Sequence, residues 1–244
     1  MLYLVCAIPC EAEPLIRFFG LKSLSNELPF RIFSRGEISL VITGVGRIAA
    51  ATACGYLHGQ FAKTNPIWLN VGIAGHPTAE IGNPFMVHKI EGARSFYPSF
   101  TFSPPCPTAP LLTVDKPAKE LSKECLYDME GAGFYESAAR FSSLELIHLV
   151  KIVSDDGAQI LDKNRVSALV EKQILLIEEI TLTLQTLQEE IHLPTTPAPK
   201  RLSATEQHQW KRLITQAEAL GLSPKEDLPS LRKQIEDHVP AHLH

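Results

Sequence analysis

The chain has 244 residues, a formal net charge of −4 and 45% hydrophobic residues. This length suffices for one sizeable core, or one core with an appendage, and the composition is that of an ordinary soluble globular protein. The slight acidity provides no basic face for nucleic acid, and charged or polar residues interrupt each apolar run before membrane-spanning length. We therefore expect neither nucleic-acid binding nor membrane insertion.

The first residues, MLYLVCAIPCEAE, lack the basic segment of a signal peptide and are typical of a buried first strand. Five cysteines lie scattered along the chain without a CxxC pair, at Cys6, Cys10, Cys54, Cys106 and Cys125. This odd number and wide spacing argue against a disulfide framework or a zinc site. We therefore expect reduced thiols, a cytoplasmic protein and no bound metal.

Continuous apolar, β-prone runs predict strands at 2–8, 30–33, 38–43, 67–71, 85–90 and 146–153, and the second and third of these are expected to form a hairpin around Arg35-Gly36. Apolar residues at helical spacing predict helices at 11–19, 47–61 and 164–191. Glycine turns are expected after two of the strands, at 44–46 and 72–75. Strands that alternate with helices indicate an α/β fold with a largely parallel sheet.

Two stretches fall outside this alternation. Residues 97–110 contain five prolines and predict a long loop. Residues 193–200, LPTTPAPK, predict a proline-rich linker between a main domain at 1–192 and a helical C-terminal extension at 201–244. Within the extension we expect helices at 205–220 and 228–239. The first has an apolar stripe that must cover the chain's own core or a second subunit, made of Trp210, Leu213, Ile214 and Ala217.

Acidic residues gather where ligands bind in open α/β sheets, at the carboxyl ends of the strands. They form three groups: Glu11, then Asp128 with Glu130, then Asp155 with Asp156. Carboxylates that share an apolar pocket shift one another's pKa values, which supports acid–base chemistry near neutral pH. Cleavage of a glycosidic bond needs such a set, because one group protonates the leaving group, another activates water and a third holds sugar hydroxyls.

Each feature also has a structural explanation. A GxG before a helix serves tight turns as well as phosphate binding. Met129, at a strand end, could fill the core as well as support a ligand. An acid ahead of a helix is commonly an N-cap or a partner of the helix dipole, which could apply to Glu130, Asp155 and Asp156. For any single acid the structural explanation is the simpler one, so only the combination indicates chemistry.

Five segments in order resemble the nucleoside phosphorylase/nucleosidase superfamily, and its methylthioadenosine/S-adenosylhomocysteine nucleosidase branch in particular. They are AIPCEAEPL, TGVGRIAAATA, LNVGIAGH, YDMEGAGFYESAARF and VKIVSDDGA, and the resemblance covers residues 1 to about 192. It implies a three-layer α/β fold with a twisted mixed sheet flanked by helices, and a cofactor-free enzyme. It also implies a homodimer or larger homo-oligomer with aromatic residues crossing between subunits, for which Phe96, Tyr97 and Phe100 are candidates.

The resemblance implies roles for individual residues. Glu11 matches the acid near the nucleophilic water, and Asp155 matches the residue that protonates purine N7. Glu130 matches the carboxylate that takes the ribose hydroxyls, with Met129 packed against base and sugar. Further candidates for substrate binding at the same strand ends are Asp128, Gly46, Gly72, Ile73, Ala74 and Ser154.

Phosphorolysis requires a site for a dianion, built from arginines, hydroxyls or backbone N–H groups. Phosphorylases of this family typically have an arginine and a serine around the central glycine, where this sequence has Asn70 and Ile73. Glu11 also stands where hexameric phosphorylases have an arginine, and Arg47 compensates only in part. The sequence therefore favours hydrolysis of a purine-type nucleoside. The alternatives are a phosphate-dependent phosphorylase and a catalytically idle nucleoside-binding or partner-docking protein.

The sequence departs from the family in the segment before DMEG, which is short here. Val114, Asp115 and Pro117 are candidates for the contacts to the base that a longer segment would make. His76 follows the second glycine turn and could reach a ligand. His58 and His148 lie in helix and strand patterns and are interpreted as packing or surface residues.

Overall fold

The computed structural model describes residues 1–25, 27–118, 120–157, 162–191, 209–210, 213–214 and 228–236. The chain divides into two compact units, Met1–Gln188 and Glu189–His244. None of the helices described combines the length and the apolar character that a membrane span requires. The first unit carries the sheet and, with it, all the candidate catalytic and substrate-binding residues.

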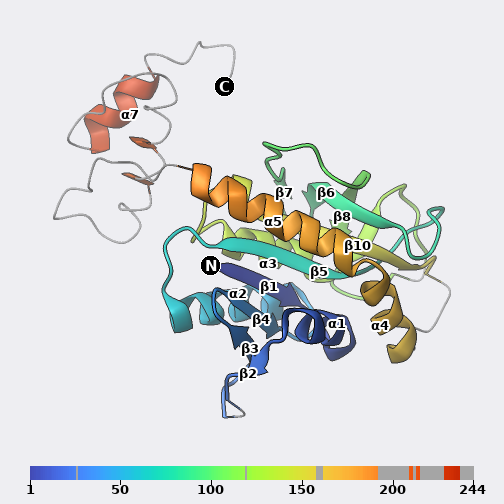
Figure 1. The fold of residues 1–244 in the computed structure, drawn as a ribbon. Helices are drawn as coiled ribbons and strands as arrows, with labels where there is room; N and C mark the ends of the chain where they lie inside the picture. The colour runs from blue at the N-terminus through green and yellow to red at the C-terminus, as the bar shows by residue number, and fades with distance from the viewer. Residues whose placement is uncertain are drawn as a thin grey trace. The chain divides into compact units, whose positions relative to one another are not determined.

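One mixed sheet organises the first unit (Figure 1). Its strands are β1 (Leu2–Cys6), β2 (Lys22–Ser23), β3 (Arg31–Arg35), β4 (Ile38–Ile42), β5 (Ile67–Gly75), β6 (Pro84–Glu91), β7 (Ser95–Phe96), β8 (Thr108–Thr113), β9 (Leu126–Asp128) and β10 (Ile147–Asp155). The order across the sheet is β10-β6-β8-β9-β5-β1-β4-β3-β2, with β7 beside β6. Because β10 also pairs with β5, five strands close into a ring, and β1 with its neighbours extends from it.

The directions of the strands correct one expectation and confirm another. Parallel pairs join β1 to β4 and β5, β5 to β10, and β8 to β6 and β9. The other described pairings are antiparallel. The hairpin expected from 30–33 and 38–43 is present as β3 and β4. The alternation of strands and helices nevertheless overestimated parallel pairing, because it does not register the short strands and the antiparallel pairing of β6 with β10. The twisted mixed sheet that the family resemblance implied is confirmed.

Helices flank the sheet, as the family resemblance implied. They are α1 (Pro9–Phe19), α2 (Arg47–Phe61), α3 (Gly131–Ala138), α4 (Lys163–Lys172) and α5 (Ile174–Glu190), with a 3₁₀ turn, η1, at Leu144–Leu146. In Figure 1, α5 crosses in front of the strands while α3 lies behind them. Gly20 ends α1 in the left-handed conformation, at φ +61°, as a glycine C-cap does.

Several predicted boundaries differ from those of the structure. The predicted helix 164–191 is two helices, because Gln173 leaves helical geometry and its amide donates a hydrogen bond to the carbonyl of Gly82. Residues 72–75 form the end of β5 and not a turn. The strand predicted at 146–153 continues to Asp155, and the loop predicted at 97–110 ends where β8 begins.

Buried aromatic rings fill the core between the helices and the sheet. The indole of Trp68 packs on Tyr3 and donates a hydrogen bond to Ser142 Oγ at 3.0 Å. His148 lies against two phenylalanine rings, and burial lowers its pKa to about 4. His58 stacks on Phe141, with its pKa also lowered by burial. Both histidines are packing residues, as interpreted from the sequence.

Two of the three aromatic residues considered for a subunit interface are used within the first unit. Phe100 contacts His148, with 5.0 Å between ring centroids, and Phe96 packs on Tyr135 at 5.5 Å. The third, Tyr97, is 64% exposed. Tyr97 is therefore the one of the three with a largely exposed side chain.

The second unit contains α7 (Leu228–Glu236), within the helix predicted at 228–239. Trp210 and Ile214, two members of the predicted apolar stripe, are buried, as is Leu231. The predicted linker 193–200, Ala217 and most of the predicted helix 205–220 lie outside the described residues.

Candidate active site

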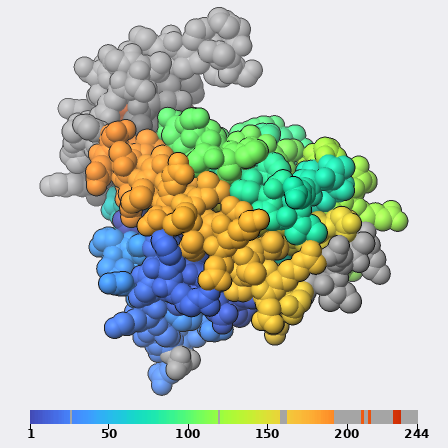
Figure 2. All heavy atoms as spheres, turned by 45° about the vertical axis from the view of Figure 1, so that its right-hand side comes forward, coloured from blue at the N-terminus to red at the C-terminus, as the bar shows by residue number. Residues whose placement is uncertain are grey.

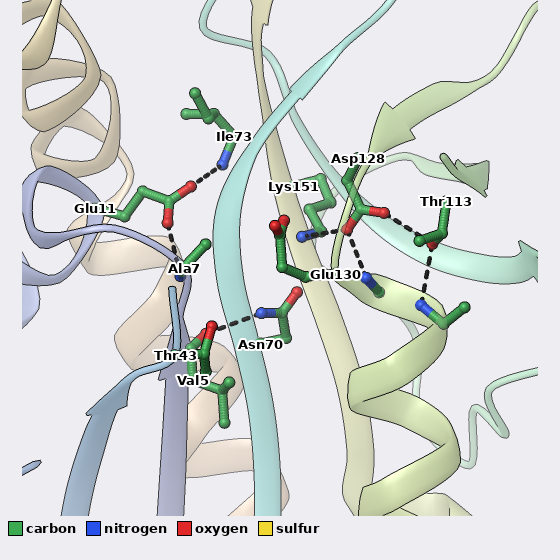
Figure 3. A network of polar contacts seen from close by, with 12 residues as sticks. Val5, Ala7, Glu11, Thr43, Asn70, Ile73, Thr113, Asp128, Glu130 and Lys151 are labelled. Atoms are coloured by element: carbon green, nitrogen blue, oxygen red, sulfur yellow. Dashed lines mark hydrogen bonds and ion pairs between the residues drawn. The ribbon is translucent and has the colours of Figure 1, made fainter. Parts of the chain in front are cut away.

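Glu11 is a buried carboxylate held by the backbone of two strands (Figure 3). It lies in the first turn of α1, directly after β1. Oε2 accepts hydrogen bonds from the N–H groups of Ala7 at 2.9 Å and Ile8 at 3.1 Å, and Oε1 accepts one from Ile73 at 2.9 Å. Burial raises the pKa of Glu11, although the N–H of Ile73 and the charge of Lys151 oppose the shift. The side chain thereby fixes the end of β1 against β5.

Gly72 provides the space that this carboxylate occupies. A Cβ at Gly72 would lie 2.8 Å from Glu11 Oε1. Gly72 also pairs with Lys151 in the parallel β5–β10 ladder, so the two residues share one face of the sheet. The close approach of the Glu11 side chain therefore explains why residue 72 is a glycine. Gly72 needs no special backbone geometry.

Lys151 is a buried cation among these carboxylates, with only 1% of its surface exposed. Its Nζ lies 2.8 Å from Asp128 Oδ2. Burial lowers the pKa of Lys151, but the charges of Asp128, Glu130 and Glu11 together raise it above its ordinary value. The ammonium group therefore stays charged in the interior. Lys151 was not predicted from the sequence, where its one signal is a lysine within a mostly apolar strand.

Asp128 anchors both this lysine and the start of α3. Its Oδ1 accepts a hydrogen bond from Thr113 Oγ1 at 2.8 Å, and its Oδ2 accepts one from the N–H of Gly131 at 2.8 Å. Thr113 Oγ1 in turn accepts a hydrogen bond from the N–H of Ala132 at 3.0 Å. Both oxygens of Asp128 are thus engaged within the protein.

Glu130 completes the cluster from the start of α3. It is 8% exposed, and its Oε1 accepts a hydrogen bond from the N–H of Gly46 at 2.7 Å. Gly46 has φ +107°, a conformation that favours glycine, and it precedes α2. Burial raises the pKa of Glu130, and the charge of Lys151 opposes this shift. Met129, between the two acids, is half-buried.

The glycines that follow Glu130 allow α3 to begin in a crowded place. A Cβ at Gly133 would overlap the backbone carbonyl of Arg47 at the start of α2. A Cβ at Gly131 would lie 2.5 Å from the side chain of Leu111 and 3.0 Å from Asp128 Oδ2. The Gly-Ala-Gly segment is therefore explained by helix packing that holds the two acids in place.

Asp155 lies at the end of β10, apart from the buried cluster. It is half-buried, with its Oδ2 accepting a hydrogen bond from Ser154 Oγ at 2.6 Å and its Oδ1 accepting one from the N–H of Gly157 at 2.9 Å. Ser154 is buried and also donates to the carbonyl of Ala74, itself buried, at 3.3 Å. Asp155 follows Lys151 by four residues, about 13 Å of extended strand. In the described part of the chain, no hydrogen bond or ion pair joins it to the cluster.

Other sequence candidates have partners of their own. Arg47 forms a two-point ion pair with Asp115, at 3.0 Å and 3.2 Å, on the surface. His76 Nδ1 accepts hydrogen bonds from the N–H groups of Thr78 and Ala79, and its ring stacks on Phe85. These contacts give Arg47 and His76 structural roles without bringing them into the cluster.

A separate surface cavity of about 540 Å³ lies between α1 and α4. Its lining includes Cys10, Glu13 and Lys163, together with the exposed ion pair of Arg17 and Glu171. In Figure 2 the gold atoms of α4 adjoin the dark blue atoms of the N-terminal segment on this face. The cavity shares no residue with the buried cluster, and its charged groups are exposed. Among the described residues, no group of three or more His, Cys, Asp or Glu side chains could hold a metal ion.

Comparison with known proteins identifies the fold. No protein-family model matches the sequence, and a search of the curated proteins finds no match. The apo structure of 5'-methylthioadenosine nucleosidase from Arabidopsis thaliana is similar, with a TM-score of 0.61 and 17% identity, over 75% of this chain and 95% of that one. So is 5'-methylthioadenosine/S-adenosylhomocysteine nucleosidase from Helicobacter pylori with butyl-thio-DADMe-Immucillin-A, with a TM-score of 0.61 and 11% identity, over 75% and 97%.

A structure of the corresponding nucleosidase from Chlamydia trachomatis matches with a TM-score of 0.57 and 19% identity, over 73% of this chain and 97% of that one. These chains are thus covered almost completely. At identities this low, the structural similarity establishes a shared fold alone. The mixed sheet with its flanking helices agrees with that fold. The chain described here therefore has the nucleoside phosphorylase/nucleosidase fold, in the form found in the methylthioadenosine/S-adenosylhomocysteine nucleosidases.

Proposed function

We propose that the protein hydrolyses the N-glycosidic bond of a purine-type nucleoside. The observation that carries the proposal is the buried cluster in which Glu11, Glu130 and Asp128 surround Lys151. Ionised, these groups sum to a net negative charge, which stabilises the positive charge that develops on the sugar as the bond breaks. The likeness in fold to nucleosidase structures supports the same assignment.

Glu130 is proposed to hold the ribose hydroxyls, with Met129 packed against base and sugar. Glu130 sits at the start of α3, and only one oxygen is engaged by the N–H of Gly46 in the hydrogen bonds described above. Asp128 is assigned a positioning role, because its hydrogen bonds go to Thr113, Gly131 and Lys151.

Glu11 is proposed to act as the general base for water. Its raised pKa makes the carboxylate a better proton acceptor near neutral pH. A carboxylate offers about four lone-pair sites, and three backbone N–H groups occupy three of them. Oε1 retains a site that could accept a hydrogen bond from water.

Asp155 is proposed to protonate the departing base. The electrons of the glycosidic bond leave with the purine, which takes a proton at N7 from the Asp155 carboxyl group. A half-buried acid at a strand end can be protonated again from solvent after each turnover. The hydrogen bonds from Ser154 and Gly157 fix its direction.

Water is favoured over phosphate by the charges on this face of the sheet. A phosphate dianion would meet the carboxylates of Glu11 and Glu130, while the one lysine of the cluster already pairs with Asp128. Arg47, the cation considered for phosphate, is paired with Asp115. These contacts support hydrolysis as the reaction of the site.

The experiment that tests the proposal is purine release from methylthioadenosine, S-adenosylhomocysteine, 5'-deoxyadenosine, adenosine and inosine, with and without phosphate. We expect release without phosphate from at least one 5'-substituted adenosine. A strict requirement for phosphate would make the protein a phosphorylase. Binding without release from any substrate would contradict the proposal and favour a nucleoside-binding protein.

We also propose that the protein is a cytoplasmic homodimer or larger homo-oligomer. The five free thiols suit a reducing compartment. Val45 is 56% exposed and Ile48 is 79% exposed, and both lie beside Gly46, which contacts Glu130. A second subunit on this surface would cover them and shield the substrate from solvent. Sedimentation of the wild type and of Ile48→Glu tests this, and an equal mass for both at the monomer value would contradict it.

A further inference from the structure

A buried amide next to the cluster has one half of its hydrogen-bonding capacity unused. Asn70, in β5, is 2% exposed, and its Nδ2 donates a hydrogen bond to the carbonyl of Val5 at 2.9 Å. Its Oδ1 is buried and has no hydrogen-bond partner in the described part of the chain. Exchanging the two amide atoms would set Oδ1 against the carbonyl oxygen of Val5, so the orientation is fixed.

The free oxygen belongs to the same face as the cluster. Residues two apart in a strand point to the same side, so Asn70 shares the face of Gly72, where the Glu11 carboxylate lies and where Lys151 pairs. Figure 3 shows the Asn70 oxygen turned away from Val5. A buried acceptor without a donor is unfavourable, so a donor is expected from a molecule that enters the site.

The chemistry of the neighbours indicates which donor this is. The acidic side chains of the cluster, Glu11 and Glu130 among them, accept hydrogen bonds and cannot satisfy another acceptor when ionised. Water carries two hydrogens and can therefore serve a carboxylate and the amide oxygen together. We propose that Asn70 Oδ1 accepts a hydrogen bond from the attacking water, and that this makes Asn70 a positioning residue that selects water as the nucleophile.

The inference rests on the proposed function and specifies its water step. The water oxygen forms a bond to the anomeric carbon, and the electrons of the broken glycosidic bond leave with the protonated purine. One hydrogen of the water passes to Glu11 as a proton. The other hydrogen remains on the new sugar hydroxyl and forms the hydrogen bond to Asn70 Oδ1.

Competition between water and an alcohol as the nucleophile can show whether Asn70 positions the water or has only a structural role. Methanol has a single hydroxyl hydrogen, so it can serve either Glu11 or Asn70 but not both. The wild type should therefore discriminate against methanol when it competes with water. Without the amide oxygen, the discrimination should weaken.

The test is cleavage of a responsive substrate in water–methanol mixtures, with the ratio of methyl glycoside to free sugar measured in the products. We expect the wild type to form less methyl glycoside than the methanol content alone would give. Asn70→Leu should raise the ratio about tenfold, which corresponds to about 1.4 kcal/mol. In Asn70→Asp, the new carboxyl group is buried beside other acids and is expected to be protonated, so its O–H can donate to the carbonyl of Val5 while its other oxygen still accepts a hydrogen bond from water. The ratio for this variant should stay close to that of the wild type.

Both products come from one active site, so the ratio does not depend on how much of a variant is folded. A wild-type ratio that simply follows the methanol content would overturn the inference without any variant. So would an unchanged ratio in Asn70→Leu. If the wild type releases no purine from any nucleoside, the proposed function fails and this inference fails with it. If it releases purine but forms methyl glycoside in proportion to the methanol content, only this inference fails.

Discussion

The two ends of the candidate site differ in how their acids are held. At the end proposed to hold the sugar, Glu11 and Asp128 are buried, and each is fixed by contacts from distant segments of the chain. At the end proposed to hold the base, Asp155 is half-buried and is held by Ser154 and Gly157, its close neighbours in sequence. Under the proposed mechanism, the acids that must keep their position around the sugar and the water are inside, and the acid that donates a proton to the departing base is near solvent.

The largest effect should follow from removing the acid at the base end. Asp155→Asn should lower kcat by about 10²- to 10⁴-fold, the usual contribution of general acid catalysis. The melting temperature should change little, because an asparagine can keep the hydrogen bonds to Ser154 and Gly157. Turnover and thermal unfolding of this variant check both expectations.

Asp156→Asn provides the matched control, since it removes one charge at the adjacent exposed position. Its turnover should stay well above that of Asp155→Asn. Equal losses in the two variants would mean that general charge near the base, and not proton transfer from Asp155, matters.

Substitutions of the buried ion pair should lower the unfolding free energy of the protein. Asp128→Ala leaves Lys151 charged and without its ion-pair partner, which typically costs about 3–5 kcal/mol of unfolding free energy. Lys151→Met should cost less, because Asp128 keeps its hydrogen bonds from Thr113 and Gly131. Urea unfolding of both single variants and of the double variant measures the coupling between them. Equal and additive costs would show that the pair is not coupled as described.

A smaller loss of unfolding free energy is expected from filling the space between Gly72 and the Glu11 carboxylate. Gly72→Ala should cost about 1–3 kcal/mol, because the added methyl group would press on Glu11 Oε1. Gly55→Ala, in the interior of α2, has nothing within 4 Å of the added Cβ and should instead gain about 0.5–1 kcal/mol. Chemical unfolding of the two variants gives the comparison, and a neutral Gly72→Ala would show that Glu11 is not confined there.

The smallest effect concerns pH. Because the pKa of Glu130 is raised in the folded protein, the folded state binds more protons than the unfolded state between the ordinary value of 4.5 and the raised one. Unfolding free energy from this group is therefore highest below pH 4.5 and falls as pH rises through the raised pKa. Glu130→Gln removes this fall and can keep the bond from Gly46. Parallel unfolding curves for the wild type and this variant at all pH values would contradict the assignment.

Local sequence patterns predicted the elements whose contacts are local. The helix at 47–61 is bounded as predicted, and the glycines before it take the positive φ values of a turn. The predicted helix 164–191 was divided because Gln173 contacts Gly82, which is 91 residues away. The short strands likewise depend on partners that no single segment reveals.

The same distinction applies to the site. The acids could be selected from the sequence because they follow β-prone runs, and the structure brings Glu11, Asp128 and Glu130 together. Lys151 could not, since a lysine in an apolar strand is explained only by carboxylates that arrive from other elements. Asn70 was noted as a departure from phosphorylases, but its free oxygen is visible only once Val5 is seen to occupy its nitrogen. The catalytic roles of these residues remain predictions.

The most direct measurement is the fate of isotopically labelled water. A nucleoside that the protein cleaves would be incubated in ¹⁸O-enriched water without phosphate, and the sugar product analysed by mass spectrometry at once, before exchange at the anomeric position. Hydrolysis predicts free sugar carrying one ¹⁸O at the anomeric hydroxyl. Unlabelled sugar, or purine release only after phosphate is added with a sugar phosphate as product, would contradict the account.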